Sequence, residues 1–225
     1  MDKINSIKKA CRITDEVFSL LLKNIKEFRT ERDIRLFIIR AIRKKGHKIA
    51  FTPIVASDKN AANPHHRGDA KLKKGFCVID LGAEYNGYCS DMTRTVYLGR
   101  PTKREKELYN KVLGVQKKAI RLMKVGKGYG DVCTKVRKIL GKRQKYFIHA
   151  LGHGVGRKIH EKPKVSCKSK DIVKVNEIIT IEPGLYYKKK LGIRIEDTIL
   201  IKRTKTEILT KTKKGLIYIL KTPFS

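Results

Sequence analysis

The chain has 225 residues, which suffices for one large domain or two small ones with a substantial hydrophobic core. Its 54 Lys and Arg residues against 21 Asp and Glu residues give a formal net charge of +33, but 40% of the residues are hydrophobic, which excludes a disordered polycation. No segment approaches the roughly 18 apolar residues of a membrane-spanning helix, so a transmembrane protein is excluded as well.

Two further features of the composition predict the compartment. The N-terminal residues lack the apolar core of a signal peptide. The 5 cysteines are odd in number and form no CxxC pair, which favours reduced thiols over a disulfide framework. We therefore expect a cytoplasmic protein without disulfides.

The surplus of positive charge has two interpretations. Phosphates attract Lys and Arg through counterion release, so one interpretation is contact with RNA or ribosomes. The other is a solvated, lysine-rich surface, which is favoured because the lysines are spread through every segment and no RNA-binding signature is present. Weak, salt-sensitive contact with RNA is compatible with both.

Local signals in the first half of the chain predict two helices, a strand and a hairpin. Thr30 and Asp33 form a capping-box pattern for a helix that ends at Gly46. Asn86-Gly87 is typical of a two-residue hairpin turn. The expected elements are a helix over about 5–27, a helix from Thr30 to Gly46, a strand over 49–56, and hairpin strands over about 76–84 and 88–98.

The second half repeats this order. Thr102 and Glu105 form another capping box, and Gly141 ends the helix that follows. The expected elements are helices from Thr102 to about 123 and over about 130–141, then strands over 147–151, 177–182 and 192–202. We therefore expect an α+β fold in a single domain, 1–225, built from two similar halves of about 1–100 and 101–225.

Carboxylates are scarce in this chain, yet several lie inside apolar strands. Asp80, Glu182 and Glu196 each directly follow an isoleucine in a predicted strand. A buried carboxylate is unfavourable unless a cation or another partner stabilises it. The pattern therefore predicts positive charge beside these side chains.

The hairpin geometry brings two aspartates together. The turn at Asn86-Gly87 places residue 80 opposite residue 93, so Asp80 and Asp91 become diagonal neighbours on one face, roughly 7–8 Å apart at Cα. At that separation both can reach one metal ion or a close pair of ions. A solvent-exposed hairpin face with unremarkable aspartates is the alternative.

The histidines favour the metal interpretation. Three of the 6 histidines, His149, His153 and His160, fall within one glycine-rich segment. A single buried histidine is usually a core residue, but three beside glycines that admit a ligand, in a chain with isolated buried acids, indicate a metal or catalytic site.

Several segments of the sequence resemble those of a known family. The segments 80–95, 149–160, 182–186 and 192–197, in this order, look like those of the pita-bread metallopeptidases, most of all the Xaa-Pro dipeptidase (prolidase) and aminopeptidase P branch. The resemblance runs over nearly the whole chain. It implies two pseudo-symmetric halves around a curved antiparallel sheet covered by helices, in agreement with the repeat described above.

The resemblance also implies a ligand set for two divalent metal ions. Asp91 and Glu196 would bridge the ions, Asp80 would bind one of them, and His153 with Glu182 would bind the other. Four carboxylates would balance two cations, and a water between them would become the nucleophile. Mn²⁺ or Co²⁺ suits such a site best, with Fe²⁺ or Zn²⁺ as alternatives.

Further roles carry over by the same resemblance. Glu182 would also move a proton to the leaving amine, His160 would hydrogen-bond the scissile carbonyl, and His65 would lie at the substrate end. Arg194 would orient ligands, and Tyr186 would lie near the proton pathway.

The metal ligands alone do not distinguish the members of the family. The segment 90–95, the sequence Pro64-His65-His66 and the additional His149 beside the substrate favour a peptidase that hydrolyses the N-terminal Xaa-Pro bond of dipeptides or short peptides. Methionine aminopeptidase is the alternative, followed by an RNA- or ribosome-binding relative, which the intact ligand set disfavours. The chain begins at the part that resembles the catalytic domain, whereas members of this branch commonly carry an N-terminal domain that helps form dimers, so the oligomeric state stays open.

Overall fold

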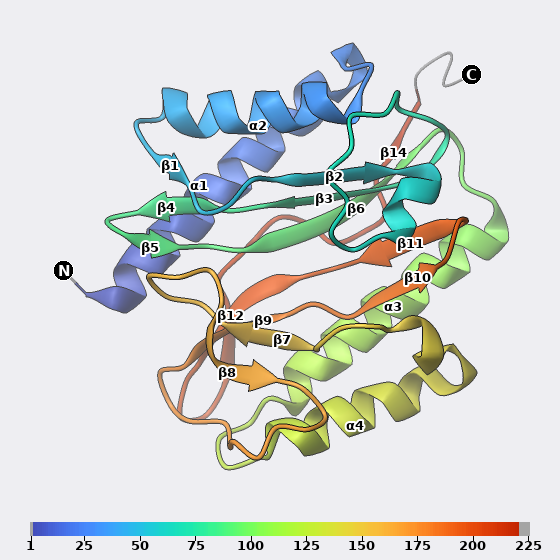
Figure 1. The fold of residues 1–225 in the computed structure, drawn as a ribbon. Coiled ribbons are helices and arrows are strands. Elements are labelled where there is room, and N and C mark those ends of the chain that lie inside the picture. The colour runs from blue at the N-terminus through green and yellow to red at the C-terminus, as the bar shows by residue number, and fades with distance from the viewer. Residues whose placement is uncertain (1, 221–225) are drawn as a thin grey trace.

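The computed structural model describes residues 2–220 and has two pairs of helices on opposite sides of a layer of strands (Figure 1). The first pair lies against strands of the first half of the chain, and the second pair against strands of the second half. The helices are α1 (Lys3–Asn24), α2 (Glu31–Lys44), α3 (Lys103–Leu122) and α4 (Tyr129–Leu140), with 3₁₀ turns at Ile25–Glu27, Asp58–Ala62 and Gly141–Tyr146.

The helix ends confirm the capping signals in the sequence. Thr30 and Asp33 form a complete capping box at the start of α2, in which each side chain accepts a hydrogen bond from the other residue's backbone N–H. Thr102 and Glu105 do the same at the start of α3. Gly141, which follows α4, has a φ of 58°, a backbone conformation that side chains other than glycine seldom adopt.

The strands of residues 2–220 form a four-stranded sheet, a five-stranded sheet and two smaller sheets. All strand pairs are antiparallel except β14 with β6. The four-stranded sheet has the order β14 (Tyr218–Ile219), β6 (Met92–Leu98), β3 (Gly75–Leu81), β2 (Ile54–Ser57). The five-stranded sheet has the order β13 (Thr206–Ile208), β12 (Asp197–Ile201), β9 (Ile178–Ile181), β7 (Gly152–Gly154), β8 (Glu161–Val165). The smaller sheets are β1 (Lys48–Ile49), β4 (Ala83–Tyr85), β5 (Tyr88–Cys89), and β10 (Gly184–Tyr187), β11 (Leu191–Arg194).

The halves of the chain have corresponding parts. In the first, α1 and α2 pack with β3 and β6 around one hydrophobic cluster; in the second, α3 and α4 pack with β9 and β12 around another. Asp80 near the end of β3 and Asp91 just before β6 therefore correspond to Glu182 just after β9 and Glu196 just before β12. Mixed helix and sheet content confirms the α+β class, while the assignment of 1–225 to a single domain stays a prediction.

Three predicted strands outside the hairpin differ from the structure. The strand expected over 192–202 is divided into β11 and β12, which lie in different sheets. The strand expected over 49–56 is divided into β1 and β2, because residues 50–53 leave the ladder at a segment that ends in Pro53, which has no N–H to donate. The strand expected over 147–151 is wrong: Phe147 is buried in the second cluster, but the regular strand begins only at Gly152. The apolar residues of this segment therefore indicate burial in the core and not a strand.

The predicted hairpin has the expected register with a break. Asp80 pairs with Thr93, and Tyr85 pairs with Tyr88 across the Asn86-Gly87 turn. The strands are interrupted at Gly82, where a Cβ would lie 2.0 Å from the carbonyl oxygen of Ser90. The close approach of these two backbones requires glycine, so the hairpin divides into β3 with β6 and β4 with β5.

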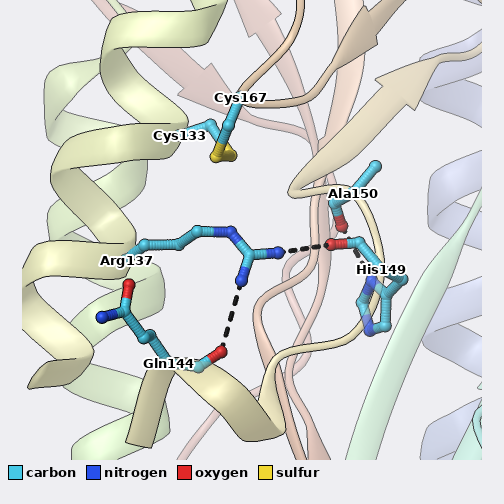
Figure 2. The surroundings of a disulfide bond; sticks show 6 residues. All are labelled: Cys133, Arg137, Gln144, His149, Ala150 and Cys167. Atoms are coloured by element: carbon cyan, nitrogen blue, oxygen red, sulfur yellow. Dashed lines mark hydrogen bonds between the residues drawn. A yellow bond between two sulfur atoms is a disulfide. The ribbon is translucent and has the colours of Figure 1, made fainter. Parts of the chain in front are cut away.

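The expectation of five reduced thiols is also wrong. Cys133 of α4 and Cys167, which follows β8, form a disulfide (Figure 2), whereas Cys11, Cys77 and Cys89 are free and buried. The packing of α4 beside the segment after β8 brings two cysteines 34 positions apart in sequence to a Cα–Cα distance of 4.9 Å. Among residues 2–220, no helix is both long and apolar enough to cross a membrane.

Candidate metal centre

A cavity of about 1030 Å³ opens where the strands of the two halves meet. Nine of the ten residues that the sequence singled out line it, and the tenth, Tyr186, lies directly behind two of them. The nine are His65, Asp80, Asp91, His149, His153, His160, Glu182, Arg194 and Glu196. The fold therefore brings together side chains spread over more than a hundred residues of sequence.

Three of these side chains form a cluster with the geometry of a metal site. Asp91, His153 and Glu196 each offer a ligand atom, and these atoms all lie within 4.8 Å of one another. His153 Nε2 lies 3.5 Å from Asp91 Oδ2 and 3.6 Å from Glu182 Oε1. The imidazole thus faces carboxylates supplied by both halves of the chain.

The hydrogen bonds of His153 orient its ring for a ligand role. Its Nδ1–H donates to the carbonyl of Gly154 at 3.1 Å, which leaves the lone pair on Nε2 directed toward the carboxylates. Thr180 Oγ1 accepts from the backbone N–H of His153 at 3.1 Å. Burial lowers the pKa of His153 to about 4, so the ring is neutral at pH 7, the form that binds metals.

The carboxylates are crowded and incompletely paired. Burial raises the pKa of Asp80, of Glu182 (to about 7), and, more strongly, of Asp91 and Glu196. For Asp91, the nearby charges of Glu196 and Asp80 add to the effect of burial. Oδ1 of Asp80 and Oδ1 of Asp91 are buried without a hydrogen-bond donor. Buried carboxylate oxygens without a donor, beside the neutral imidazole of His153, are suitable ligands for divalent cations.

Arg194 and Thr93 connect the carboxylates of the two halves. Arg194 Nη2 donates to Asp80 Oδ2 at 2.8 Å, and its Nε donates to Thr93 Oγ1 at 3.0 Å. Thr93 Oγ1 in turn donates to Glu196 Oε2 at 2.6 Å. Sequence reasoning missed Thr93, although its predicted place opposite Asp80 was a usable signal.

His149 and Tyr186 form a second chain of hydrogen bonds beside the cluster. Arg194 Nη1 donates to Tyr186 Oη at 3.0 Å, Tyr186 Oη donates to His149 Nε2 at 2.8 Å, and His149 Nδ1–H donates to the carbonyl of Ala150 at 2.7 Å. Arg137 of α4 donates to the carbonyl of His149 at 3.4 Å (Figure 2). Burial, followed by the charge of Arg194, lowers the pKa of His149 to about 3. His149 is therefore a neutral acceptor with a fixed ring.

The more exposed part of the cavity carries His65, His160 and several cations. The ring centroids of His160 and His153 lie 4.4 Å apart, and His65 enters from the loop after the 3₁₀ turn at Asp58–Ala62. Sequence reasoning did not select the basic side chains of the cavity wall, since nothing distinguished them in a chain with 54 Lys and Arg residues. They are Arg35, Arg67, Lys162 and Lys164.

Comparisons with known proteins agree with this geometry. The model of metallopeptidase family M24 matches residues 5–203. The chain is 39% identical over 221 residues to the Xaa-Pro dipeptidase of Pyrococcus furiosus, in an alignment that covers 96% of this chain and 64% of that protein.

Solved structures show the same fold. The prolidase of Thermococcus sibiricus is similar with a TM-score of 0.93 and 39% identity, over 97% of this chain and 61% of that one. A zinc-substituted aminopeptidase P of E. coli in complex with product is similar with a TM-score of 0.83 and 26% identity, over 94% of this chain and 56% of that one. The pita-bread fold is thus confirmed, and the chain spans less than two thirds of the length of these relatives.

Proposed function

The chain belongs to metallopeptidase family M24, and from this membership we propose that it hydrolyses the bond between an N-terminal residue and a following proline in dipeptides or short peptides. The substrate class comes from relatives named Xaa-Pro dipeptidase and prolidase. The observation that carries the proposal is the gathering, at a single cavity, of the neutral imidazole of His153 with the carboxylates of Asp80, Asp91, Glu182 and Glu196.

Asp80, Asp91, His153, Glu182 and Glu196 would hold two divalent ions, with Mn²⁺ or Co²⁺ as the first choices and Fe²⁺ or Zn²⁺ as alternatives. The proposal is supported by the 4.8 Å cluster of Asp91, His153 and Glu196 and by the unpaired oxygens of the two aspartates. Divalent ions bound there would supply Lewis acidity and make water a nucleophile near neutral pH.

The remaining side chains would bind and orient the peptide. His160, exposed beside His153, is suited to donate an N–H to the carbonyl of the scissile bond. Glu182 faces the cavity near His153 and would carry a proton to the leaving nitrogen. His65 would contact the residue beyond the scissile bond. The four cations of the wall would attract the free carboxylate of a short peptide.

Arg194 and Tyr186 would act through the groups that they hold. Arg194 is buried and bonded to Asp80, so it would fix that carboxylate and offset part of the negative charge. Tyr186 would hold the His149 ring at the cavity wall. Neither side chain needs to touch the peptide to perform these functions.

A substrate panel tests the proposal. The purified protein, stripped with a chelator and reloaded separately with Mn²⁺, Co²⁺, Fe²⁺ and Zn²⁺, is assayed on an Xaa-Pro dipeptide, its C-terminal amide, and a Met-Ala peptide. We expect metal-dependent cleavage of the Xaa-Pro dipeptide and slower cleavage of the amide. Release of methionine from Met-Ala without any Xaa-Pro cleavage would refute the assignment.

The charge of +33 gives a separate, weaker proposal about partners. Surface lysines would make nonspecific contact with RNA or ribosomes, and such binding must weaken steeply between low and moderate salt. Binding to a ribosomal RNA fragment that is insensitive to salt would refute this contact. The cytoplasmic location stays a prediction.

A further inference from the structure

The segment 57–70, here called the 57–70 loop, runs from the last residue of β2 through the 3₁₀ turn at Asp58–Ala62 and forms a wall of the cavity. Several of its groups form hydrogen bonds with one buried side chain. Within this loop, Pro64, His65 and Arg67 line the cavity. The loop also reaches the candidate metal centre directly, because Arg194 Nη1 donates to the carbonyl of Pro64 at 3.3 Å. A displacement of this loop would therefore change the shape of the cavity and the surroundings of Arg194.

The buried side chain that holds the loop is that of Glu31, the first residue of α2. Its Oε1 accepts from the backbone N–H of Ser57 at 2.7 Å, from Ser57 Oγ at 3.0 Å and from Asn60 Nδ2 at 3.1 Å. Its Oε2 accepts from His66 Nε2 at 2.8 Å and from the backbone N–H of Ala70 at 3.2 Å. One carboxylate thus binds the beginning, the middle and the end of the loop.

The tautomer of His66 follows from this contact. The backbone N–H of Gly68 is also directed at this Nε2, at 3.1 Å, and it can donate there only when the nitrogen carries no proton. A proton on Nε2 gives a charge-assisted hydrogen bond to Glu31, whereas a bare Nε2 would direct its lone pair at the carboxylate. The bond to the carboxylate is the stronger of the two, so the ring donates to Glu31, the Gly68 N–H does not use this acceptor, and His66 is held next to His65.

Two other contacts hold the same loop from outside. Arg35, one turn after Glu31 on α2, donates to the carbonyl of Gly68 at 3.0 Å and pairs with Asp69. On the opposite side the loop lies on β11, so closely that a Cβ on Gly192 would lie 1.7 Å from the carbonyl oxygen of Ala61. The loop is thus held between α2 and the strand that carries Arg194.

We propose that Glu31 is a positioning residue of the enzyme, which holds the 57–70 loop and through it places Pro64 and His65 at the cavity. Its five hydrogen bonds reach both ends of the loop, whereas the contact with β11 is made through the 3₁₀ turn at Asp58–Ala62, so the carboxylate adds the bonds that hold His66 and Ala70. The effect on catalysis rests on the proposed function; the effect on the loop does not.

The test replaces the carboxylate by an amide of the same shape. In Glu31→Gln, at least two of the five donors face an NH₂ group whichever way the amide turns, so the loop loses bonds without losing volume. The matched control is Asp33→Asn on the same helix turn, since Asp33 accepts from the backbone amides of Arg29 and Thr30 instead of the loop.

The first measurement is hydrogen exchange of residues 57–70, which needs no substrate. We expect exchange in Glu31→Gln to quicken roughly tenfold or more, since the lost bonds are buried and charge-assisted, and exchange in Asp33→Asn to match the wild type there. Unchanged exchange in Glu31→Gln, or equal quickening in both variants, would overturn the inference.

The second measurement is kinetic, on the Xaa-Pro dipeptide. We expect the KM of Glu31→Gln to rise roughly tenfold, with a smaller change in kcat and an unchanged thermal shift with Mn²⁺, because the loop holds none of the proposed ligands. In a His65→Ala background the same substitution should change KM less than about threefold, since the placed group is already absent. A full, multiplicative effect in that background would overturn the placement of His65 by Glu31.

The two measurements separate the two proposals. A wild type that cleaves no Xaa-Pro peptide refutes the proposed function, while the exchange comparison still decides whether Glu31 holds the loop. A wild type that cleaves the peptide, with a Glu31→Gln variant of unchanged KM, refutes the positioning role and leaves the proposed function standing.

Discussion

Replacing Asp91 by asparagine tests the electrostatics of the candidate metal centre. Without a cation, burial and the neighbouring carboxylates Glu196 and Asp80 raise the pKa of Asp91 well above its ordinary value. A carboxyl whose pKa is raised by folding destabilises the folded protein at every pH above its unfolded-state pKa. The asparagine variant lacks this penalty, so we expect the metal-free variant to be more stable than the metal-free wild type.

The size of the effect follows from the spacing of the side chains. Ligand atoms of Asp91 and Glu196 lie within 4.8 Å, where two unit charges at an effective dielectric constant of about 20 repel by about 3 kcal/mol. Proton uptake relieves part of this repulsion, which leaves a gain of roughly 1–3 kcal/mol at pH 8 and a rise in Tm of roughly 3–8 °C. The gain should shrink as the pH falls toward the unfolded-state pKa of about 4 and vanish near pH 3, where the wild-type side chain is protonated in both states.

Added metal should reverse the order of stability. At a Mn²⁺ concentration 100 times the Kd, the wild type gains about 2.7 kcal/mol, whereas Asp91→Asn has lost a proposed ligand and gains less. Thermal unfolding at pH 8, with chelator and with Mn²⁺, measures both effects, and Asp171→Asn at an exposed position serves as the control. A chelated variant no more stable than the wild type, or one with an equal response to Mn²⁺, would contradict this account.

Three other changes test separate parts of the structure. Glu196→Ala should lower peptidase activity at least about a thousandfold with an unchanged circular dichroism spectrum, because alanine supplies no metal ligand at this position; activity within tenfold of wild type would contradict its proposed role. Tyr186→Phe removes the hydroxyl that accepts from Arg194, so kcat/KM should fall about tenfold and urea unfolding should show a loss of about 1–2 kcal/mol; wild-type values for both would count against the chain of hydrogen bonds. Reduction by a dithiol should destabilise the wild type by about 4 kcal/mol, since the Cys133–Cys167 bond links residues 34 positions apart, and should leave the Tm of Cys133→Ser unchanged; an equal Tm of the wild type with and without dithiol would show that this bond does not form in solution.

Much of the fold could be predicted because its signals are local. The capping boxes at Thr30 and Thr102 involve side chains three positions apart, and the Asn86-Gly87 turn determines the pairing of Asp80 with Thr93. The division at Gly82 could not be predicted, because it depends on contact with a backbone eight positions away after the chain has turned. In the sequence, such a contact is visible only as a glycine without an evident local reason.

Part of the candidate site could also be predicted because its signals are local. Isolated acids in apolar strands and clustered histidines are visible in sequence, and the resemblance to a family supplied the rest of the ligand set. Glu31 was not selected, since a glutamate in the first turn of a helix usually stabilises that helix. The link between Cys133 and Cys167 was missed because it arises from the packing of α4 against a distant segment.

The proposed ligands come from both halves of the chain, and this origin has a consequence for cooperativity. A cation that joins Asp91 to Glu196 would close a loop of more than a hundred residues and couple the two hydrophobic clusters. With ions bound, we expect one sharp unfolding transition for the whole molecule. After chelation, the clusters can melt one after the other, so the transition should broaden and its denaturant dependence should become shallower.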